Sequence, residues 1–376
     1  MIERIYLDHN ATTALRPLAK QAMLSLMGNP VNASSVHADG RLAQAALEQA
    51  RNDIAKNLHI LSSGVIFTSG GSEACNLAVA GAQKVDQPIS RRIVSAVEHS
   101  AVSASAAQSD MLPVDEHGVV DLEQLEALLQ GQEPAMVCVM LANNETGAIQ
   151  PIREIVDIVH GHDGLVFCDA TQAIGKIDVS FAGLGVDLMA LSAHKFGGPL
   201  GAGALLIAPK ISIDPIIRGG GQELRRRAGT QNLPAIVGMS VALSEALEGV
   251  RDRELISSRR DAMEDKILAQ VPECVVFSKG TERLPNTSCF SAPGLSAEKL
   301  VMALDLAGIS VSSGSACSSG KVSESHVLAA MHVPSNLAHG AIRVSFGWNS
   351  DAEKDGQRLV EIWTREARRM GQLAAE

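Results

Sequence analysis

Short apolar runs alternate with amphipathic stretches along the first 210 residues of the chain. Each run reads as continuous Val, Ile, Leu or Cys, which is typical of strands in a sheet that helices cover on both faces. Helical patterns fall between the runs at 73–83, 122–129 and 152–160. The alternation predicts an α/β fold with a mostly parallel sheet. The six predicted strands are 65–68, 92–97, 135–143, 164–170, 188–193 and 204–208.

The pattern changes after the sequence GGGQE at 219–223. A long helical stretch over about 233–270 follows, and we expect it to act as a connector. Beyond it, the apolar runs CVVF, TSCFSA, ISVSS and AIRVSF mix with helical patterns at 296–307, 326–331 and 351–374. This mixture predicts a smaller α+β unit. We expect a larger domain over residues 16–251 and a smaller one over residues 1–15 plus 252–376.

Composition narrows the possible partners. A chain of 376 residues with 46% hydrophobic and 20% charged residues can bury cores for two domains. Its formal net charge of −10 and its 3% aromatic content argue against a surface for nucleic acid or anionic lipid. The N-terminus lacks the pattern of a signal peptide, and no run approaches the roughly 18 apolar residues of a membrane span. We therefore expect a cytoplasmic protein whose partners are small molecules or proteins.

Six cysteines are scattered along the chain without the CxxC spacing of a metal site. A reducing compartment leaves them as thiols, so we expect neither a metal site nor a disulfide framework. Cys317 stands apart, because the Gly/Ser-rich sequence SSGSACSSG around it predicts a mobile loop. The other five lie in predicted strands or helices, and those in apolar strands are expected to be inert core thiols. They are Cys75, Cys138, Cys168, Cys274 and Cys289.

Ligands of a parallel α/β sheet collect outside the carboxyl ends of its strands. The sequence FTSGGSEACNLA, at 67–78, places a glycine turn between a strand and a helix that begins near Ser72, with Glu73 in its first turn. Free N–H groups and the helix dipole make such an N-terminus a phosphate cradle. The same residues also fit an ordinary Ser N-cap. The Gly-Lys-Ser/Thr of an ATP-binding loop does not occur in this stretch.

Three further polar groups follow predicted strands. His99, in AVEHSAV, fits either a catalytic residue or a hydrogen-bonded helix cap. The sequence NNETG, at 143–147, fits either a binding site or turn chemistry. Asp169, in FCDATQA, ends an apolar strand, and a buried carboxylate requires a cationic or hydrogen-bonding partner. Asp169 therefore carries more weight than the other two.

Lys195 follows the next apolar strand, in the sequence LSAHKFGGPLGAGALLIAP. By itself it fits a surface lysine in a turn. Shielded from water and near other cations, its amine would be available as a nucleophile for Schiff-base chemistry. A phosphate cradle, an acidic strand end, a lysine and a nearby histidine together match pyridoxal 5'-phosphate. This cofactor requires an anchored phosphate, a protonated ring nitrogen and a lysine on its aldehyde.

Nine motifs in order, from residue 6 to about 347, resemble those of the cysteine desulfurases, and more closely those of the NifS/IscS-like branch of the class V aminotransferase group. They are YLDHNATT (6–13), TSGGSEACN (68–76), EHSAV (98–102), NNETG (143–147), DATQA (169–173), SAHK (192–195), GGGQE with RRAGTQN (219–232), SSGSACSSG (312–320) and IRVSFG (342–347). The resemblance implies fold type I of the pyridoxal-phosphate-dependent transferases. In that fold a large domain with a mostly parallel seven-stranded sheet is joined to a smaller α+β C-terminal domain.

The resemblance also implies roles for the residues that meet the cofactor. Lys195 would bind its aldehyde, Asp169 would pair with its ring nitrogen, and His99 would stack on the ring and move protons. Gln172 would hydrogen-bond its phenolic oxygen. The phosphate would be held by Gly71, Ser72, Ser192 and His194, and by Thr230 from the second subunit of a homodimer.

The substrate carboxylate would be bound by Asn144, which also touches the cofactor, and by Arg343. A planar guanidinium suits a carboxylate because it offers two parallel N–H donors. Taken alone, Arg343 would fit an ordinary surface ion pair. The motifs show two mild departures, since Ser72 stands where threonine is common and Ala193 where glycine often occurs.

Cys317 separates the members of the group. The resemblance implies that its thiolate attacks the sulfur of bound L-cysteine, which leaves a persulfide on Cys317 and releases L-alanine. A mobile loop would carry that sulfur to an acceptor protein, such as a scaffold for iron–sulfur clusters.

Other functions stay open on the sequence. A selenocysteine lyase or a class V aminotransferase would share the fold, although a transaminase has no use for Cys317. A non-catalytic sulfur-carrier or scaffold subunit would keep the fold without the chemistry. The filled positions of Lys195, Asp169 and Cys317 argue against that last alternative.

Overall fold

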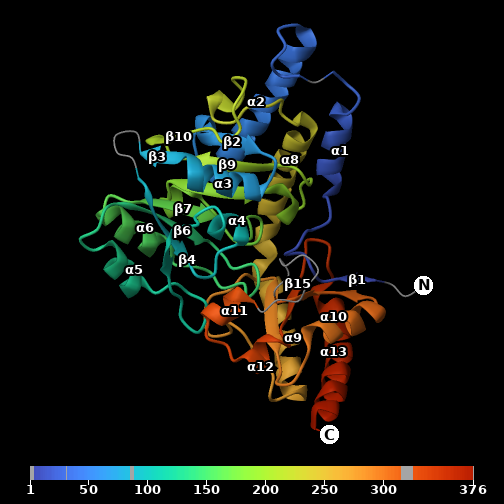
Figure 1. Cartoon of the computed structure of the whole chain (residues 1–376). Coiled ribbons are helices and arrows are strands. Elements are labelled where there is room, and N and C mark those ends of the chain that lie inside the picture. The colour runs from blue at the N-terminus through green and yellow to red at the C-terminus, as the bar shows by residue number, and fades with distance from the viewer. Residues whose placement is uncertain (1–3, 31, 85–88, 315–324, 376) are drawn as a thin grey trace.

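A seven-stranded sheet forms the centre of the larger part of the molecule (Figure 1). The structure is a computed structural model that describes residues 4–30, 32–84, 89–314 and 325–375, with side chains to residue 370. Neighbouring strands pair in parallel except on both sides of β9, so one strand runs against the other six. In spatial order the strands are β2 (Val65–Thr68), β9 (Gly203–Ile207), β8 (Leu188–Ser192), β7 (Leu165–Asp169), β6 (Ala135–Met140), β4 (Arg91–Ser95) and β5 (Asp110–Leu112). The predicted mostly parallel α/β fold is confirmed.

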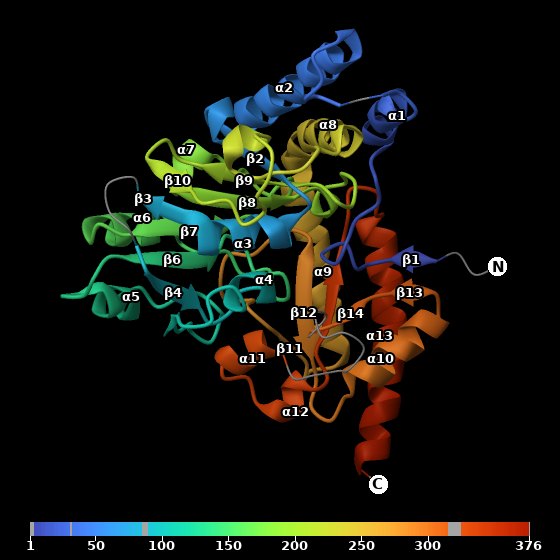
Figure 2. The same ribbon diagram turned by 45° about the horizontal axis from the view of Figure 1, so that its top comes forward.

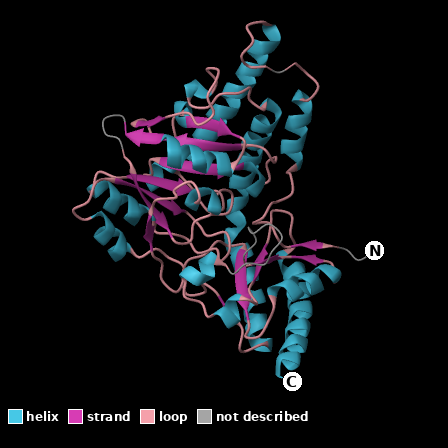
Figure 3. Cartoon of the chain, in the orientation of Figure 1, coloured by secondary structure: helices cyan, strands magenta, loops and turns pink. Residues whose placement is uncertain are grey.

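Successive side chains of these strands point to opposite faces of the sheet and pack into two different apolar clusters. In β6, Met136 and Cys138 pack on the face covered by α3 (Gly71–Gly81) and α4 (Ser100–Ser103). Val137 and Val139 pack on the opposite face. That face is covered by α2 (Ala38–Leu58), α5 (Leu122–Leu129), α6 (Ile152–Gly161), α7 (Phe181–Leu184) and α8 (Leu233–Gly249). Helices on both faces, visible in Figure 3, explain why the strands read as unbroken apolar runs.

The C-terminal part contains a smaller antiparallel sheet of four strands. Their order is β11 (Val275–Val276), β12 (Thr287–Ser291), β15 (Ile342–Ser345) and β14 (Ser312–Ser313). A separate apolar cluster joins this sheet to α9 (Arg253–Gln270), α10 (Ala297–Leu306) and α13 (Ala352–Ala375), with the Trp363 ring edge-on to Phe290 at 5.1 Å. The predicted α+β mixture is therefore observed. The domain limits at 16–251 and 252–376 stay a prediction.

The N-terminal segment belongs to this C-terminal part. Strand β1 (Ile5–Tyr6) pairs in parallel with β13 (Ile309–Ser310), and Leu7 lies in the C-terminal apolar cluster (Figure 2). From there the chain crosses to α1 (Pro17–Leu26), which packs on α8. Residues 8–14 therefore run between the two sheets. This position matters for the site described below.

Three details differ from the sequence prediction. The stretch 233–270 is two helices, because one 3₁₀ turn at Val250–Asp252 separates α8 from α9. The helix predicted to reach residue 83 ends at Gly81, and β3 (Ala82–Lys84) pairs instead with β10 (Ile211–Ile213). The edge strand β5 has two exposed residues and no apolar run, so the pattern gave no sign of it. The remaining helices are α11 (His326–Ala330) and α12 (Ser335–Ala338).

Among the described residues, one helical segment, Leu233–Gln270, is long and apolar enough to span a membrane by length and composition alone. Of its most apolar window, 56% is buried inside the fold. Residues such as Met239 and Leu243 are fully buried against α1 and α2. The segment is therefore packed like the core helix of a soluble protein.

A buried ion pair ties α2 to the turn that follows the central sheet. Arg51 donates from Nη1 to Oε2 and from Nη2 to Oε1 of Glu223, at 2.8 and 3.0 Å. Glu223 also accepts the backbone N–H of Phe67 on β2 at 2.9 Å. The Glu223 side chain is 0% exposed and that of Arg51 7%. Removing one member of such a pair leaves an uncompensated buried charge.

We expect Glu223→Ala to lower the free energy of unfolding by about 3–5 kcal/mol, because Arg51 would lose its buried partner. Urea denaturation followed by circular dichroism measures this. Glu48→Ala is the matched control, since Glu48 contacts the same arginine at 3.3 Å but is 45% exposed. That substitution should cost no more than about 1 kcal/mol. Equal losses in the two variants would contradict the assignment.

Candidate active site

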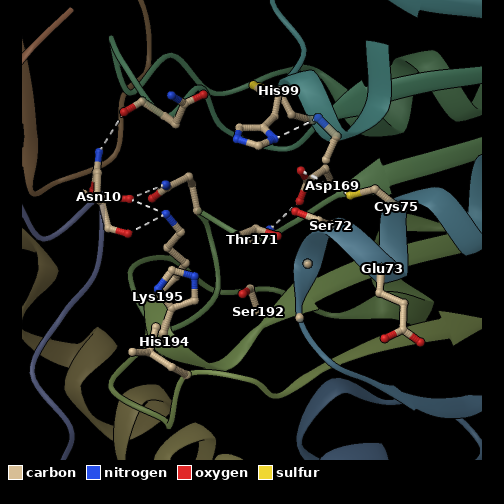
Figure 4. Close-up of a pocket in the computed structure, with 18 of the residues that line it drawn as sticks. Asn10, Ser72, Glu73, Cys75, His99, Asp169, Thr171, Ser192, His194 and Lys195 are labelled. Atoms are coloured by element: carbon tan, nitrogen blue, oxygen red, sulfur yellow. Dashed lines mark hydrogen bonds between the residues drawn. The ribbon is translucent and has the colours of Figure 1, made fainter. Parts of the chain in front are cut away.

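A cavity of about 460 Å³ opens where the parallel strands of the central sheet end (Figure 4). It is bounded by the ends of β6, β7 and β8, the start of α3, residues 10 and 11, and Arg343 on β15. Ten of the twelve site residues expected from the sequence line it. They are Gly71, Ser72, His99, Asn144, Asp169, Gln172, Ser192, His194, Lys195 and Arg343.

The two other expected residues are not among the lining residues. Thr230 is exposed and does not line the cavity. Cys317 lies outside the described residues.

Lys195 lies on a 3₁₀ turn, Ala193–Lys195, directly after β8. Its Nζ donates to the backbone oxygens of Asn10 and Ala11, at 2.7 and 2.9 Å. Both acceptors are backbone oxygens of the N-terminal segment. The alternative interpretation of Lys195 as a surface lysine in a turn is therefore wrong.

Asp169 ends β7 with its carboxylate buried at the bottom of the cavity. Oδ1 accepts the backbone N–H of Thr171 at 2.9 Å, and Oδ2 lies 3.8 Å from Sγ of Cys75. The parallel register places Asp169 beside Met140 on β6 and Ala190 on β8. The Asp169 carboxyl group is thus fixed at the centre of the strand ends, within reach of a ligand in the cavity.

His99 faces the same cavity and also caps α4. Its Nδ1 accepts the backbone N–H of Ala101 at 3.1 Å, so the proton of the neutral ring is on Nε2. Burial lowers the pKa of His99, and the nearby positive charge of Lys195 lowers it further, against the opposing effect of Asp169. The ring is therefore neutral at pH 7. The helix-cap interpretation of His99 is therefore confirmed, and the capping residue also lines the cavity, whereas its catalytic role stays a prediction.

The start of α3 has the features of an anion cradle. Gly70 has φ of +155°, and the helix begins at Gly71 directly under Ser192. A Cβ on Gly71 would lie 3.2 Å from Cβ of Ser192 and 3.3 Å from Oγ1 of Thr171, so only glycine leaves this space open. Thr171 Oγ1 is buried and has no hydrogen-bond partner among the described residues. An anion such as a phosphate would satisfy this hydroxyl and the first N–H groups of the helix.

Glu73, in the first turn of α3, does not present an unpaired negative charge to this anion cradle. It accepts the N–H of Ser69 at 2.8 Å and a hydrogen bond from Arg227 Nε at 2.8 Å. These contacts lower the pKa of Glu73 against the effect of burial, so its charge is already paired. His194 lines the cavity from the 3₁₀ turn, and burial together with Lys195 lowers its pKa to about 4.

Arg343 lies on β15 and reaches the cavity from the smaller sheet. It is 2% exposed, donates from Nη1 to the backbone oxygen of Asn144 at 3.1 Å and from Nη2 to Asp8 at 2.7 Å. Its Nε is buried without a hydrogen-bond partner among the described residues. A buried guanidinium with a spare donor is able to bind a carboxylate, so the interpretation as a surface ion pair is wrong.

Comparisons with known proteins agree with this geometry. Residues 5–355 match the aminotransferase class-V family. Among curated relatives, a cysteine desulfurase of Cereibacter sphaeroides is 42% identical over 96% of this chain and 95% of its own length. The cysteine desulfurase IscS of Dictyoglomus turgidum is 40% identical over 92% and 90%. A solved structure of a NifS-like protein from Rickettsia africae superposes with a TM-score of 0.86, at 33% identity over 96% of this chain and 99% of that one.

The sequence interpretation missed two residues that organise the site. Asn10, within the quoted motif YLDHNATT, makes hydrogen bonds to strands of the smaller sheet and to residues that follow strands of the central sheet. Lys176 donates to Asn10 and Gln172. The only sequence sign of Lys176 is its place seven residues after Asp169, and nothing local marks it as buried.

The sequence motif NNETG also supplies a buried carboxyl group. Glu145 accepts a hydrogen bond from Oγ of Ser325, the residue that caps α11. Burial raises the pKa of Glu145 to about 7, although Ser325 and Arg343 act in the opposite direction. A carboxyl group with a raised folded-state pKa favours folding when it is protonated. Its contribution is therefore complete below pH 4.5 and is lost as the pH rises toward 7.

We expect Glu145→Gln to remove this pH dependence, because the amide keeps an acceptor for Ser325 but carries no charge. Between pH 5 and pH 8 the variant should gain about 2–3 kcal/mol of unfolding free energy relative to the unmodified chain. Urea denaturation at several pH values measures the difference. Glu116→Gln, at an 84% exposed side chain, should leave the pH profile unchanged. If Glu145→Gln and Glu116→Gln gave the same dependence of unfolding free energy on pH, Glu145 would be ionised over the whole range from pH 5 to pH 8 and the prediction would be wrong.

Proposed function

Because the chain belongs to the aminotransferase class-V family and, within it, to the cysteine desulfurases, we propose that it removes sulfur from L-cysteine with pyridoxal 5'-phosphate. The products are L-alanine and a persulfide on Cys317. The observation that carries the proposal is that Lys195, Asp169 and the start of α3 meet in one cavity. These are the groups that the cofactor requires at its aldehyde, its ring nitrogen and its phosphate.

The described residues fit the cofactor. Asp169 would hold its ring nitrogen protonated, and Lys195 would hold its aldehyde. The unsatisfied hydroxyl of Thr171 and the N–H groups at Gly71 would hold its phosphate, with Ser72, Ser192 and His194 beside them. When bound, the cofactor supplies an electron sink for the α-carbon of the substrate.

The protein side of the reaction follows from the same contacts. Arg343, with its free Nε, and Asn144 would orient the carboxylate of cysteine. The neutral His99 carries a proton on Nε2, which it can donate or take back inside the cavity. The thiolate of Cys317 would form a bond to the substrate sulfur. The bond between that sulfur and the β-carbon breaks, and the carbon keeps the electron pair and takes up a proton to give alanine.

The other cysteines are poor candidates for this step, since the thiolate is the nucleophile. All five described cysteines are buried and free. Burial raises the pKa of each thiol, to about 12 for Cys274 and well above the ordinary value for Cys75, Cys138, Cys168 and Cys289. We propose that the persulfide is then passed to an acceptor protein in the cytoplasm, such as an iron–sulfur cluster scaffold.

We expect the protein to form alanine from L-cysteine in the presence of a reductant and to carry one added sulfur on Cys317. Cys317→Ser should lower alanine formation to the level of a protein-free control, and Lys195→Ala should do the same without the visible absorption of the bound cofactor. Amino-acid analysis and peptide mass spectrometry provide the measurements. Cys274→Ser is the matched control and should keep both alanine and persulfide. Full alanine formation by Cys317→Ser would reject the persulfide mechanism.

We further propose that the active form is a homodimer. Thr230 is exposed and outside the cavity of its own chain, so a contact with the phosphate requires a second subunit. Large apolar side chains are also exposed on α1 and near the start of α2, where a partner would cover them. They are Leu18, Leu24, Met27, Val36 and Leu42.

A mixing experiment tests whether Thr230 acts across the interface. Lys195→Ala and Thr230→Ala subunits are each expected to have little activity as homodimers. In a mixed dimer, one site has both residues intact if Thr230 comes from the partner. Unfolding and refolding the two variants together should then restore roughly a quarter of the unmodified activity. No recovery, with mixed dimers verified by differently sized tags, would place Thr230 in its own subunit's site or outside the chemistry.

A further inference from the structure

Lys176 is, like Lys195, a partly buried lysine beside the same N-terminal segment. It follows β7 and donates from Nζ to Oδ1 of Asn10 at 2.8 Å and to Oε1 of Gln172 at 2.7 Å. The described residues offer it no carboxylate at ion-pair distance, since both acceptors are neutral amides. Burial, Lys195 and Arg343 lower the pKa of Lys176 well below its ordinary value. A lysine in such surroundings costs stability, which calls for a functional reason.

Contacts on both sides fix which way the Gln172 amide points. Gln172 Nε2 donates to a backbone carbonyl oxygen, which only accepts, so the amide oxygen is the atom that faces Lys176. That carbonyl oxygen belongs to Asn10 and lies 2.9 Å from Nε2. The same oxygen accepts Nζ of Lys195 at 2.7 Å. The glutamine thus presents a donor at the place where the Lys195 amine is held.

The Asn10 amide is fixed in the same way. Its Nδ2 donates to the backbone oxygen of Asn144 at 3.1 Å and to Oγ1 of Thr287 at 2.9 Å. Its Oδ1 is left to accept from Lys176 and, at 3.3 Å, from Asn286. Both amides that meet Lys176 are therefore held in a single orientation.

Lys176 acts from behind the active-site cavity. Lys195 lines that cavity and also a second cavity of about 360 Å³, whereas Lys176 lines only the second one. Lys176 therefore has no place among the residues that would touch cofactor or substrate. Its influence passes through Gln172, Asn10 and the charge it adds next to Lys195.

We propose that Lys176 is a positioning residue, which holds the Gln172 amide with its Nε2 toward the Asn10 oxygen that also accepts Nζ of Lys195, and which adds positive charge beside that amine when it is protonated. The proposal rests on the proposed function, because Gln172 would meet the phenolic oxygen of the cofactor there. Both effects make the protonated form of the Lys195 nitrogen less favourable. Among the described residues, the other charged and titratable groups that line the two cavities are His9, Arg16, Glu73, Cys75, His99, Asp169, His194, Asp252, Arg253, Arg259 and Arg343.

The visible spectrum of the cofactor-loaded protein tests this, because it reports the protonation of the nitrogen that joins Lys195 to the cofactor. Lys176→Met should raise the midpoint pH of the spectral change by about one unit, since a neighbouring cation and an oriented donor are lost. Lys176→Arg keeps a positive charge and hydrogen-bond donors, so its midpoint pH should lie close to that of the unmodified chain. Lys210→Met, at an exposed turn, is the matched control and should leave the midpoint unchanged. An unchanged midpoint in Lys176→Met would overturn the proposal.

Coupling to Gln172 separates a positioning role from a general loss of structure. If Lys176 acts through Gln172, Lys176→Met should shift the midpoint less in a Gln172→Leu background than in the unmodified chain. Equal shifts in both backgrounds would remove the glutamine from the proposal.

A second measurement does not depend on the cofactor or on the proposed function. In the cofactor-free protein, an amine-reactive reagent modifies Lys195 only in its neutral form, and peptide mass spectrometry follows the extent against pH. The reaction should require a pH about one unit higher in Lys176→Met than in the unmodified chain or in Lys210→Met. The same pH dependence in all three would overturn the proposal, even if Lys176→Met no longer holds the cofactor.

Discussion

The backbone and side chain of Asn10 hold the two parts of the active site together. Its backbone oxygen receives Lys195 and Gln172 from the larger part of the molecule, and its side chain donates to Thr287 on the smaller sheet. Its backbone N–H donates to Ser345, two residues beyond Arg343. Asn10 therefore helps to fix the residues that would hold the cofactor relative to the arginine that would hold the substrate, together with the direct contact of Arg343 with Asn144. Preorganisation of this kind is what precise positioning of reacting groups requires.

The connection exists because β1 pairs with β13 before the chain crosses to the larger part. Pairing of the first described residues with a strand some 300 positions later brings residues 8–14 across the gap between the two sheets. Asp8 then reaches Arg343, and Tyr6 donates to the backbone oxygens of Asp8 and Thr12. Folding of the site thus requires contacts between the two ends of the chain, which form at a high cost in loop entropy.

The sequence predicted the part of this structure that local patterns determine. All six expected strands of the central sheet are present, because most of them are buried on both faces and so carry apolar runs. The motifs at their carboxyl ends meet in one cavity for the same geometric reason, since parallel strands end at one edge. Residues with no local signature escaped prediction. Asn10 and Lys176 acquire their meaning only when distant segments come together, and the exposed edge strand β5 lacks the apolar run that marked the others.

The reversed direction of β9 brings the turn that carries Lys195 next to the start of α3. A parallel neighbour would need a long crossover after β8, but an antiparallel one is reached by the short connection 193–202, which carries Lys195. At the start of β9, a Cβ on Gly203 would lie 2.6 Å from the backbone of Gly70, just ahead of α3. The connection that carries Lys195 and the start of α3 are thus held together by a close backbone contact. Loops around an active site commonly vary in length, but the connection 193–202 can tolerate almost no insertion or deletion.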